Sequence, residues 1–475
     1  MEFNFSSKTL AMPHQIEAIE FIKGNKNLAL FDEQGLGKSK IVISALCEDL
    51  KNKIIDSVLI LCKKTLVKTW KNELLKHSYL KINVIVGSKQ NRGRSFMHFS
   101  HFHIINYDSF VQELDKIKLF LGLYKFAIVL DESQVIKNPF SRITKSVLDI
   151  KDLGVKRIII TGTPIANRPE DLWSQFYFLD NGETLGEDFK EFQKNFRIKL
   201  KGETSLKKYE SILSSIKQKI NKISIRRTKD VLELPEKVYS EVFVVLEDEQ
   251  KRMYERLREE LYLELKDIDN NLILEKIDNY LVKLLRLTQI ASNPSLLEEG
   301  YKDTPAKFKE LDKIIKDILD KNEKVIIWTS FRGNIRTLRK RYQNYGALML
   351  FGEIPMAERD DIIEKFMQNP EIKILIANPS AAKEGLTLTS ANNAIYLDRS
   401  FKMDDYLQSQ DRIHRIGQQK KCQIIKLIAK DTIDEYTDEI LEKKHLLAQF
   451  ALGDINHIHE RDKFLTKAEL LKILG

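Results

Sequence analysis

The segment at residues 31–39 reads F-D-E-Q-G-L-G-K-S and constrains this chain more than any other segment. The apolar run at 27–31 predicts a buried strand, and the run at 41–46 predicts the beginning of a helix. Between them, Gly35 and Gly37 allow backbone N–H groups to turn inward around a phosphate, and the helix N-terminus adds positive potential. The segment therefore predicts a phosphate-binding loop between a strand and a helix.

Three side chains at or near this loop suit a nucleotide. Lys38 supplies a mobile positive charge for phosphate oxygens, and Ser39 can hold a magnesium ion with its hydroxyl group. Gln15, on a predicted helix just upstream, either reads an adenine edge or faces solvent. Asp32 stands where the generic phosphate-loop pattern has glycine, so the pattern taken alone is incomplete. A glycine-rich turn before a helix is the simpler alternative, but the strand–turn–helix context favours the phosphate loop.

Four more strand-like runs follow in the first half of the chain. Each is short, rich in β-branched residues and separated from the next by helical or polar sequence; they lie at 57–62, 103–106, 126–130 and 156–160. This alternation predicts an α/β fold with a parallel sheet covered by helices. Ligands of such sheets bind at the carboxyl ends of the strands, so residues that follow these runs are the functional candidates.

An acidic pair, Asp131 and Glu132, directly follows the run at 126–130. Asp131 would complete the magnesium site begun by Ser39, and Glu132 would orient or deprotonate the water that attacks the phosphate. The alternative is a pair of solvated acids in a turn, which the phosphate loop upstream makes the weaker interpretation. Two further strand ends carry polar residues: Lys63, Lys64 and Thr65 after one, and the T-G-T-P segment at 161–164 after the other.

The histidines and cysteines do not form a recognisable metal site. His98, His101 and His103 lie close together, but they alternate with phenylalanines and have no acidic or cysteine co-ligand nearby. We therefore predict that they are structural. The three cysteines are scattered and form no C-x-x-C pair, which predicts neither zinc nor disulfides and fits a reducing compartment.

A second strand–helix alternation occupies the second half of the chain. Its strands are predicted at 238–246, 324–328, 347–351, 373–377, 393–397 and 422–427. The stretches near 185–230 and 248–300 are predicted to be mainly helical, and Leu234-Pro235 marks a boundary. The predicted organisation is two α/β lobes with helical insertions, at 1–235 and 236–450, followed by a helical tail at 451–475.

The second lobe has no phosphate-loop pattern of its own, but it contains two closely spaced arginines. Arg412 and Arg415 are three positions apart, so on a helix they would share a face. Two such arginines suit the β- and γ-phosphates of a nucleotide held by the other lobe. The alternative is a basic helix face that makes surface ion pairs.

The composition favours a polyanionic partner. The chain has 475 residues and a formal net charge of +9, with charged residues of both signs. Charge alone does not distinguish nucleic acid from a membrane surface. No apolar run approaches the roughly 18 residues that span a bilayer, and the N-terminus lacks the basic and apolar regions of a secretory signal. We therefore expect no membrane partner and a cytoplasmic location.

Taken together, these segments resemble the helicase motifs of superfamily two, specifically those of the Swi/Snf-type DNA-dependent ATPases. His14-Gln15 is similar to the adenine-side motif, and residues 32–39 are similar to D-E-x-G-L-G-K-[ST], in which the aspartate is expected. Residues 131–138 resemble D-E-A-H-x-x-K-N, and residues 408–418 resemble Q-x-x-D-R-x-H-R-I-G-Q. Three further segments match: 61–70 with Glu73 (a motif that touches one DNA strand), 161–167 with Leu172-Trp173 (T-G-T-P-I-x-N…L-W), and 226–229 with Leu234-Pro235 (R-R-x-K…L-P).

Three segments depart from the family pattern. Ser133-Gln134 replaces Ala-His after the acidic pair, which bears on how hydrolysis is coupled to DNA. Residues 381–388 lack the usual glycine pair, and residues 398–401 replace the usual Trp-Asn-Pro neighbourhood. The sequence at Arg168-Pro169 and at 385–389 is nearer to the annealing-helicase branch than to the nucleosome remodellers.

The resemblance implies two RecA-like lobes, ATP and Mg²⁺ as cofactors, and a double-stranded DNA track across both lobes. The contacts expected on that track come from Lys63, Lys64, Thr65, Lys137 and Thr387. The implied function is ATP-dependent translocation on double-stranded DNA; a strand-separating helicase and a nucleotide-gated DNA-binding scaffold are the alternatives. The expected setting is a bacterium, phage or mobile element, with the nucleus as the alternative, and other proteins of a repair, replication or defence complex are possible partners.

Overall fold

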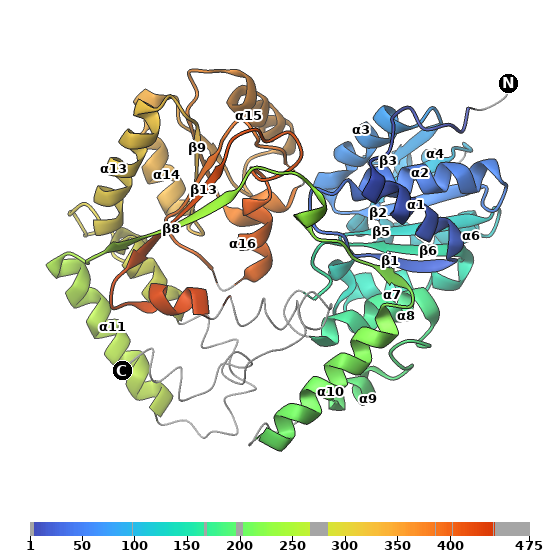
Figure 1. Cartoon of the computed structure of the whole chain (residues 1–475), viewed down its shortest axis with the longest axis horizontal. Coiled ribbons are helices and arrows are strands. Elements are labelled where there is room, and N and C mark those ends of the chain that lie inside the picture. The colour runs from blue at the N-terminus through green and yellow to red at the C-terminus, as the bar shows by residue number, and fades with distance from the viewer. Residues whose placement is uncertain are drawn as a thin grey trace. The chain divides into compact units, whose positions relative to one another are not determined.

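The structure of the chain is a computed structural model that describes residues 4–96, 98–165, 169–195, 203–266, 284–384, 386–400, 402–439 and 441, with the backbone alone at 203–210, 265, 356–357, 382–384 and 404. These residues form two compact units, which meet in the sequence between Glu233 and Leu234. Figure 1 shows unit 1 in blue to green and unit 2 in green to red. Arg168, Gly385 and the predicted tail at 451–475 lie outside the described residues.

Unit 1 contains a sheet of seven strands among its described residues, in the order β3-β4-β2-β5-β6-β1-β7, with every neighbouring pair parallel. The strands are β1 (Asn27–Leu30), β2 (Ser57–Cys62), β3 (Ile82–Ile85), β4 (Phe102–Asn106), β5 (Phe126–Asp131), β6 (Gly154–Ile160) and β7 (Ser224–Ile225). β2 and β5 are near-continuous apolar runs because helices cover both faces of a parallel sheet.

The helices of unit 1 lie on both faces of this sheet. They are α1 (Pro13–Gly24), α2 (Lys38–Lys51), α3 (Val67–His77), α4 (Lys89–Ser95), α5 (Tyr107–Gln112), α6 (Leu114–Leu121), α7 (Arg142–Leu148), α8 (Trp173–Asp180), α9 (Phe189–Lys194) and α10 (Glu203–Ile220). α1, α2 and α3 share one core with alternate residues of the central strands, among them Val58, Ile60 and Val129. The intervening residues, such as Leu59 and Leu61, are also buried and point to the other face, because successive side chains of a strand alternate.

Unit 2 has a second parallel sheet, which comprises six strands in the part of the chain that the structure describes. Their order is β10-β11-β9-β12-β13-β8. The strands are β8 (Lys237–Val244), β9 (Val325–Trp328), β10 (Leu348–Leu350), β11 (Ile374–Ala377), β12 (Asn393–Tyr396) and β13 (Cys422–Ala429), and the helices are α11 (Asp248–Lys266), α13 (Ala306–Asp320), α14 (Arg332–Arg341), α15 (Met356–Gln368) and α16 (Met403–Gln410). None of the described helices is long and apolar enough to cross a lipid bilayer.

The predicted α/β class with two parallel sheets is confirmed, and every predicted strand is present. Two strands were not predicted. β3 is short and interrupted by the polar Asn83, and β7 has only two residues at the end of a stretch predicted to be helical. α10 ends at Ile220, and the chain then pairs with β1, so long-range pairing overrides the helical pattern there.

Candidate nucleotide-binding and catalytic site

The order of strands in unit 1 gathers the candidate residues at one edge of the sheet. β2, β5, β6 and β1 are consecutive neighbours and run parallel, so their carboxyl ends lie side by side. The phosphate loop follows β1, the T-G-T-P segment follows β6, the acidic pair ends β5, and Lys63 follows β2. A Cβ atom on Gly162 would lie 3.0 Å from Gln34 Cγ, so the segment after β6 packs directly on the loop.

The loop has the backbone that its glycines predict. Gly35 and Gly37 have φ values of +95° and +81°, and α2 begins immediately after Gly37. The positive φ of Gly37 favours glycine, and a Cβ atom there would also come within 2.4 Å of Gln15 Nε2, so the Gln15 side chain would have to move. Gln15 is buried and donates to the Leu36 carbonyl oxygen at 3.2 Å, so it does not face solvent. Its contact with adenine stays a prediction.

Asp32, which stands where the generic phosphate loop has glycine, has a specific partner in Arg227. Its carboxylate is fully buried and accepts hydrogen bonds from the Arg227 backbone N–H at 3.0 Å and from Arg227 Nε at 3.1 Å, while Arg227 Nη2 binds the second oxygen. Lys38 Nζ donates to the carbonyl oxygens of Asp32 at 2.9 Å and Glu33 at 3.1 Å. The Lys38 ammonium is therefore held within the loop by the same residues that Arg227 anchors.

The segment at 226–229 continues beyond β7 as a second anchor for the loop. Glu33 N donates to the Arg227 carbonyl oxygen at 2.9 Å, and Lys229 N donates to Glu33 Oε2 at 2.8 Å. Arg226 Nη1 donates to the Phe31 carbonyl oxygen at 2.8 Å. The R-R-x-K match thus binds the first residues of the phosphate loop, a role that local sequence patterns do not reveal.

Asp131 is held in place from two sides. Its Oδ2 accepts a hydrogen bond from Trp70 Nε1 at 2.7 Å, and its backbone carbonyl oxygen accepts one from the Tyr107 hydroxyl at 2.8 Å. Burial, together with the neighbouring negative charge of Glu132, raises the pKa of Asp131 to about 6, although Trp70 and the positive charge of Lys38 act in the opposite direction. A buried carboxylate with a raised pKa, close to a lysine, is typical of a cation or phosphate site.

Glu132 adopts φ +52°, a left-handed conformation that is uncommon for a residue with a side chain and is often found at active sites. Its Oε2 accepts a hydrogen bond from Gln134 Nε2 and lies 3.6 Å from Lys63 Nζ. Ser133 Oγ donates to Gln175 Oε1 at 2.6 Å, and Gln175 Nε2 donates to the Pro164 carbonyl oxygen at 2.8 Å. Of the two residues that depart from Ala-His, Gln134 therefore binds Glu132 directly, and Ser133 connects the same turn to Gln175.

The residues predicted to bind magnesium have suitable chemistry. Ser39 offers a hydroxyl in the first turn of α2, and Asp131 offers a carboxylate at the end of β5. Both are hard oxygen donors, and Mg²⁺ commonly takes one or two protein ligands and completes its shell with water and phosphate oxygens. Ser39 and Asp131 are thus the residues that would hold the ion.

In unit 2, the arginine pair differs from the helical expectation. α16 ends at Gln410, and Arg412 and Arg415 lie in the turns that follow. They nevertheless converge, because Arg412 Nη1 at 3.4 Å and Arg415 Nη1 at 3.1 Å both donate to the Leu386 carbonyl oxygen. The expectation of a shared helix face was wrong, and a shared backbone acceptor is what aligns the two guanidinium groups.

The predicted DNA-contacting residues occupy both units. Lys63 precedes the 3₁₀ turn η1 (Lys64–Leu66), in which Lys64 is exposed and Thr65 is half-buried. Lys137 Nζ lies 3.9 Å from Asp171 Oδ2. Thr387 is exposed in unit 2, in the segment that contacts Arg412. Their contact with DNA stays a prediction.

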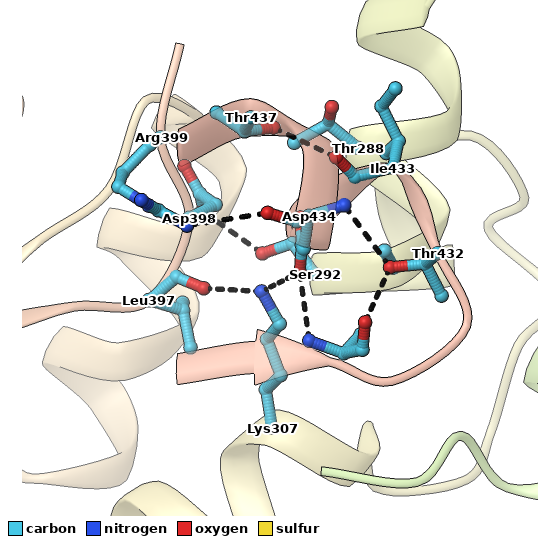
Figure 2. A network of polar contacts seen from close by, with 12 residues as sticks. Thr288, Ser292, Lys307, Leu397, Asp398, Arg399, Thr432, Ile433, Asp434 and Thr437 are labelled. Carbon is cyan, nitrogen blue, oxygen red and sulfur yellow. Dashed lines mark hydrogen bonds and ion pairs between the residues drawn. The ribbon is translucent and has the colours of Figure 1, made fainter. Parts of the chain in front are cut away.

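The departure at residues 398–401 has a structural explanation in unit 2. Asp398 is buried and accepts hydrogen bonds from Ser292 Oγ at 2.8 Å, Thr329 Oγ1 at 2.6 Å and the Ser330 backbone N–H at 2.6 Å. Burial raises the pKa of Asp398, and these donors oppose that shift. Figure 2 shows the same network extending through Lys307, which binds Asp434 and the Leu397 carbonyl oxygen.

Of the clustered histidines, His101 and His103 are buried in unit 1, whereas His98 is exposed. Burial lowers the pKa of His103 to about 4. His103 Nε2 donates to the Ser100 carbonyl oxygen at 3.0 Å, and its ring packs against Phe120 and Phe126. His101 likewise makes edge contacts with Phe5 and Phe99. These contacts agree with the predicted structural role.

Comparison with known families assigns most of the chain. Residues 14–296 match the SNF2-related domain. The chain belongs to the SNF2-related family. Residues 306–417 of this SNF2-related chain also match the helicase conserved C-terminal domain, which places the arginine pair in the second module.

Two bacterial relatives of this SNF2-related chain are longer than it is. It is 30% identical over 471 residues to an uncharacterized ATP-dependent helicase of Mycoplasma pneumoniae. The alignment covers 97% of this chain and 44% of the relative. It is 29% identical over 447 residues to the putative ATP-dependent helicase/translocase YwqA of Bacillus subtilis. That alignment covers 91% of this chain and 47% of the relative. The chain therefore spans less than half the length of these relatives.

One solved structure with a similar sequence is the SWI2/SNF2 ATPase core of Sulfolobus solfataricus in complex with dsDNA. It is 28% identical, and the alignment covers 96% of this chain and 95% of that one with a TM-score of 0.44.

Proposed function

We propose that this chain is an ATP-dependent translocase on double-stranded DNA. The observation that carries the proposal is the convergence, at one sheet edge of an SNF2-related unit, of an anchored phosphate loop with the acidic pair Asp131 and Glu132. The name of the Bacillus subtilis relative, a putative helicase/translocase, supports the same class of activity.

The proposed reaction is hydrolysis of ATP. The loop N–H groups and Lys38 bind the phosphates, whose charged oxygens are stronger acceptors than the carbonyl oxygens that Lys38 contacts here. Glu132 orients a water molecule and accepts its proton as the oxygen attacks the γ-phosphorus, and ADP leaves. Mg²⁺ held by Ser39 and Asp131 would neutralise charge on the phosphate oxygens.

We assign the remaining motif residues to phosphate and DNA contacts. Arg412 and Arg415 would add positive charge at the β- and γ-phosphates during hydrolysis. Contacts to DNA phosphates are proposed for Lys63, Lys64, Thr65, Lys137 and Thr387. Such contacts carry little base information, so binding is expected to tolerate any sequence. Two units that grip a backbone alternately can move along it without separating the strands.

The proposal is tested by the ATPase rate with no nucleic acid and with single strands, duplex, forks or RNA. We expect duplex DNA to stimulate most, and Lys38→Ala to abolish turnover with every substrate because it removes the phosphate-binding charge. Displacement of the third strand from a triplex is measured beside unwinding of a plain duplex at equal ATP. Translocation predicts triplex displacement with little unwinding.

Two outcomes would contradict the proposal. Robust unwinding without triplex displacement would identify a strand-separating helicase. An ATPase rate that no nucleic acid changes would instead favour a nucleotide-gated scaffold in a repair, replication or defence complex.

A further inference from the structure

One short segment of unit 1 reaches both acids of the catalytic pair. Lys63 lies between β2 and η1, and α3, which follows η1, carries Trp70. Lys63 Nζ lies 3.6 Å from Glu132 Oε2, and Trp70 Nε1 donates to Asp131 Oδ2 at 2.7 Å. The segment that is proposed to meet a DNA phosphate is thus the same segment that holds both carboxylates.

The two contacts differ in how easily they can break. Trp70 is 2% exposed, and its short hydrogen bond to Asp131 lies within the core. The side chain of Lys63 is 26% exposed and that of Glu132 12%, and their separation is an ion pair longer than a hydrogen bond. A partly exposed ion pair is weak, so Lys63 can exchange partners while Trp70 keeps Asp131 in place.

Glu132 Oε2 has one hydrogen-bond donor and one nearby cation. Gln134 Nε2 donates to it from within the same turn, and Lys63 approaches it from β2. A carboxylate oxygen that accepts a hydrogen bond from an amide and lies next to an ammonium group is less available to receive a proton from water. Loss of Lys63 would leave the Gln134 contact intact, so that Glu132 stays oriented but regains accepting capacity.

We propose that Lys63 is a positioning residue that restrains Glu132, and that a DNA phosphate relieves the restraint by taking Lys63 as its own partner. The inference rests on the proposed function and explains how duplex DNA stimulates hydrolysis. It also gives Gln134, which stands where the family pattern has histidine, the task of keeping Glu132 aimed when Lys63 moves away.

The first test measures turnover in a matched set of variants. Without nucleic acid, Lys63→Met should raise kcat about fivefold, which corresponds to ~1 kcal/mol, the upper range for a partly exposed ion pair. KM for ATP should stay within about twofold, because the phosphate loop is untouched, and saturating duplex should add little further stimulation. Lys63→Arg should restore the low basal rate. Lys71→Met, which removes an exposed lysine from α3, the helix that carries Trp70, should behave like the parent.

The second test needs no hydrolysis. Because coupling between two sites is reciprocal, Glu132→Gln should free Lys63 and tighten duplex binding about fivefold in the absence of ATP. The gain should disappear when Lys63→Met is combined with Glu132→Gln. This double-mutant cycle isolates the Lys63–Glu132 pair from a general loss of negative charge.

The outcomes separate this inference from the proposed function. A parent enzyme that duplex stimulates, with Lys63→Met basal kcat unchanged or reduced, would overturn the inference and leave translocation standing. Tighter duplex binding of Glu132→Gln that persists without Lys63 would overturn it as well. A parent ATPase that no nucleic acid stimulates would overturn both proposals.

Discussion

At the scale of single residues, three departures from familiar motifs have identified hydrogen-bond partners. Asp32 replaces a glycine and binds Arg227, and Ser133 and Gln134 replace Ala-His and bind Gln175 and Glu132. Buried polar groups need such partners, since an unpaired one costs about 1–3 kcal/mol. These residues therefore form hydrogen-bonded networks around the phosphate loop and the acidic pair.

Arg415 supports a prediction at this scale. Arg415→Ala should lower kcat by about 10³-fold, because an arginine that stabilises charge on the transferred phosphoryl group is worth that much or more. Nucleotide affinity and duplex binding should change little, since the phosphate loop belongs to unit 1. Single-turnover hydrolysis, beside direct nucleotide binding, measures the split between the two effects.

Lys420→Ala is the matched control for Arg415→Ala. It removes an exposed cation from the same unit, where Lys420 pairs with Glu323 at 3.3 Å. Its kcat should equal that of the parent. A normal kcat for Arg415→Ala would remove Arg415 from the mechanism.

At the scale of elements, parallel strands and the helices that follow them decide which residues meet. The neighbours β2, β5, β6 and β1 bring residues far apart in sequence to one edge, and α3 returns Trp70 to the end of β5. In unit 2, α13 plays a comparable role with one buried lysine. Lys307 is fully buried and joins the Leu397 carbonyl oxygen after β12 to Asp434 after β13 (Figure 2).

Lys307→Met should destabilise unit 2 by about 3–5 kcal/mol, because it leaves the buried Asp434 carboxylate without its cation. Lys309→Met, two residues further along α13, removes an exposed lysine that pairs with the exposed Glu247 and should cost less than about 1 kcal/mol. Hydrogen exchange of the β12 and β13 peptides measures both effects. Equal protection in the two variants would show that the buried pair does not stabilise unit 2.

At the scale of the whole molecule, the net charge of +9 favours a polyanionic partner such as DNA. Binding to DNA phosphates is expected to weaken as the salt concentration rises. Contact with DNA phosphates releases counterions, so affinity falls with a log–log slope of about 0.9 per contact. We propose three such contacts, from Lys63, Lys64 and Lys137. Raising the salt concentration from 50 to 200 mM should therefore lower duplex affinity by at least about 40-fold. Fluorescence anisotropy with unrelated duplex sequences measures the slope.

The same titration tests single contacts. Lys64→Ala should reduce the slope by about one and weaken binding equally for every sequence, as expected of a phosphate contact. An affinity that salt leaves unchanged, or one that depends on base sequence, would contradict a backbone-tracking mode.

Much of the fold and of the candidate site follows from the sequence alone. The runs that form β2, β5 and β9 are rich in β-branched and apolar residues, which predicts strands. The glycines and Lys38 predict the phosphate loop, because neighbouring residues in the chain determine the local backbone conformation. The acidic pair was also predictable, because ligands of parallel sheets bind at the carboxyl ends of the strands.

Only the tertiary structure decided which distant residues became partners. Arg227 lies 195 positions from Asp32, Trp70 lies 61 positions from Asp131, and nothing near either residue in the sequence identifies the other. β7 exists because β1 offers an unpaired edge, and Arg412 and Arg415 align because they share the Leu386 carbonyl oxygen. The physical reason is that a local pattern sets backbone conformation over a few residues, whereas the choice of a buried hydrogen-bond partner depends on how the whole sheet packs.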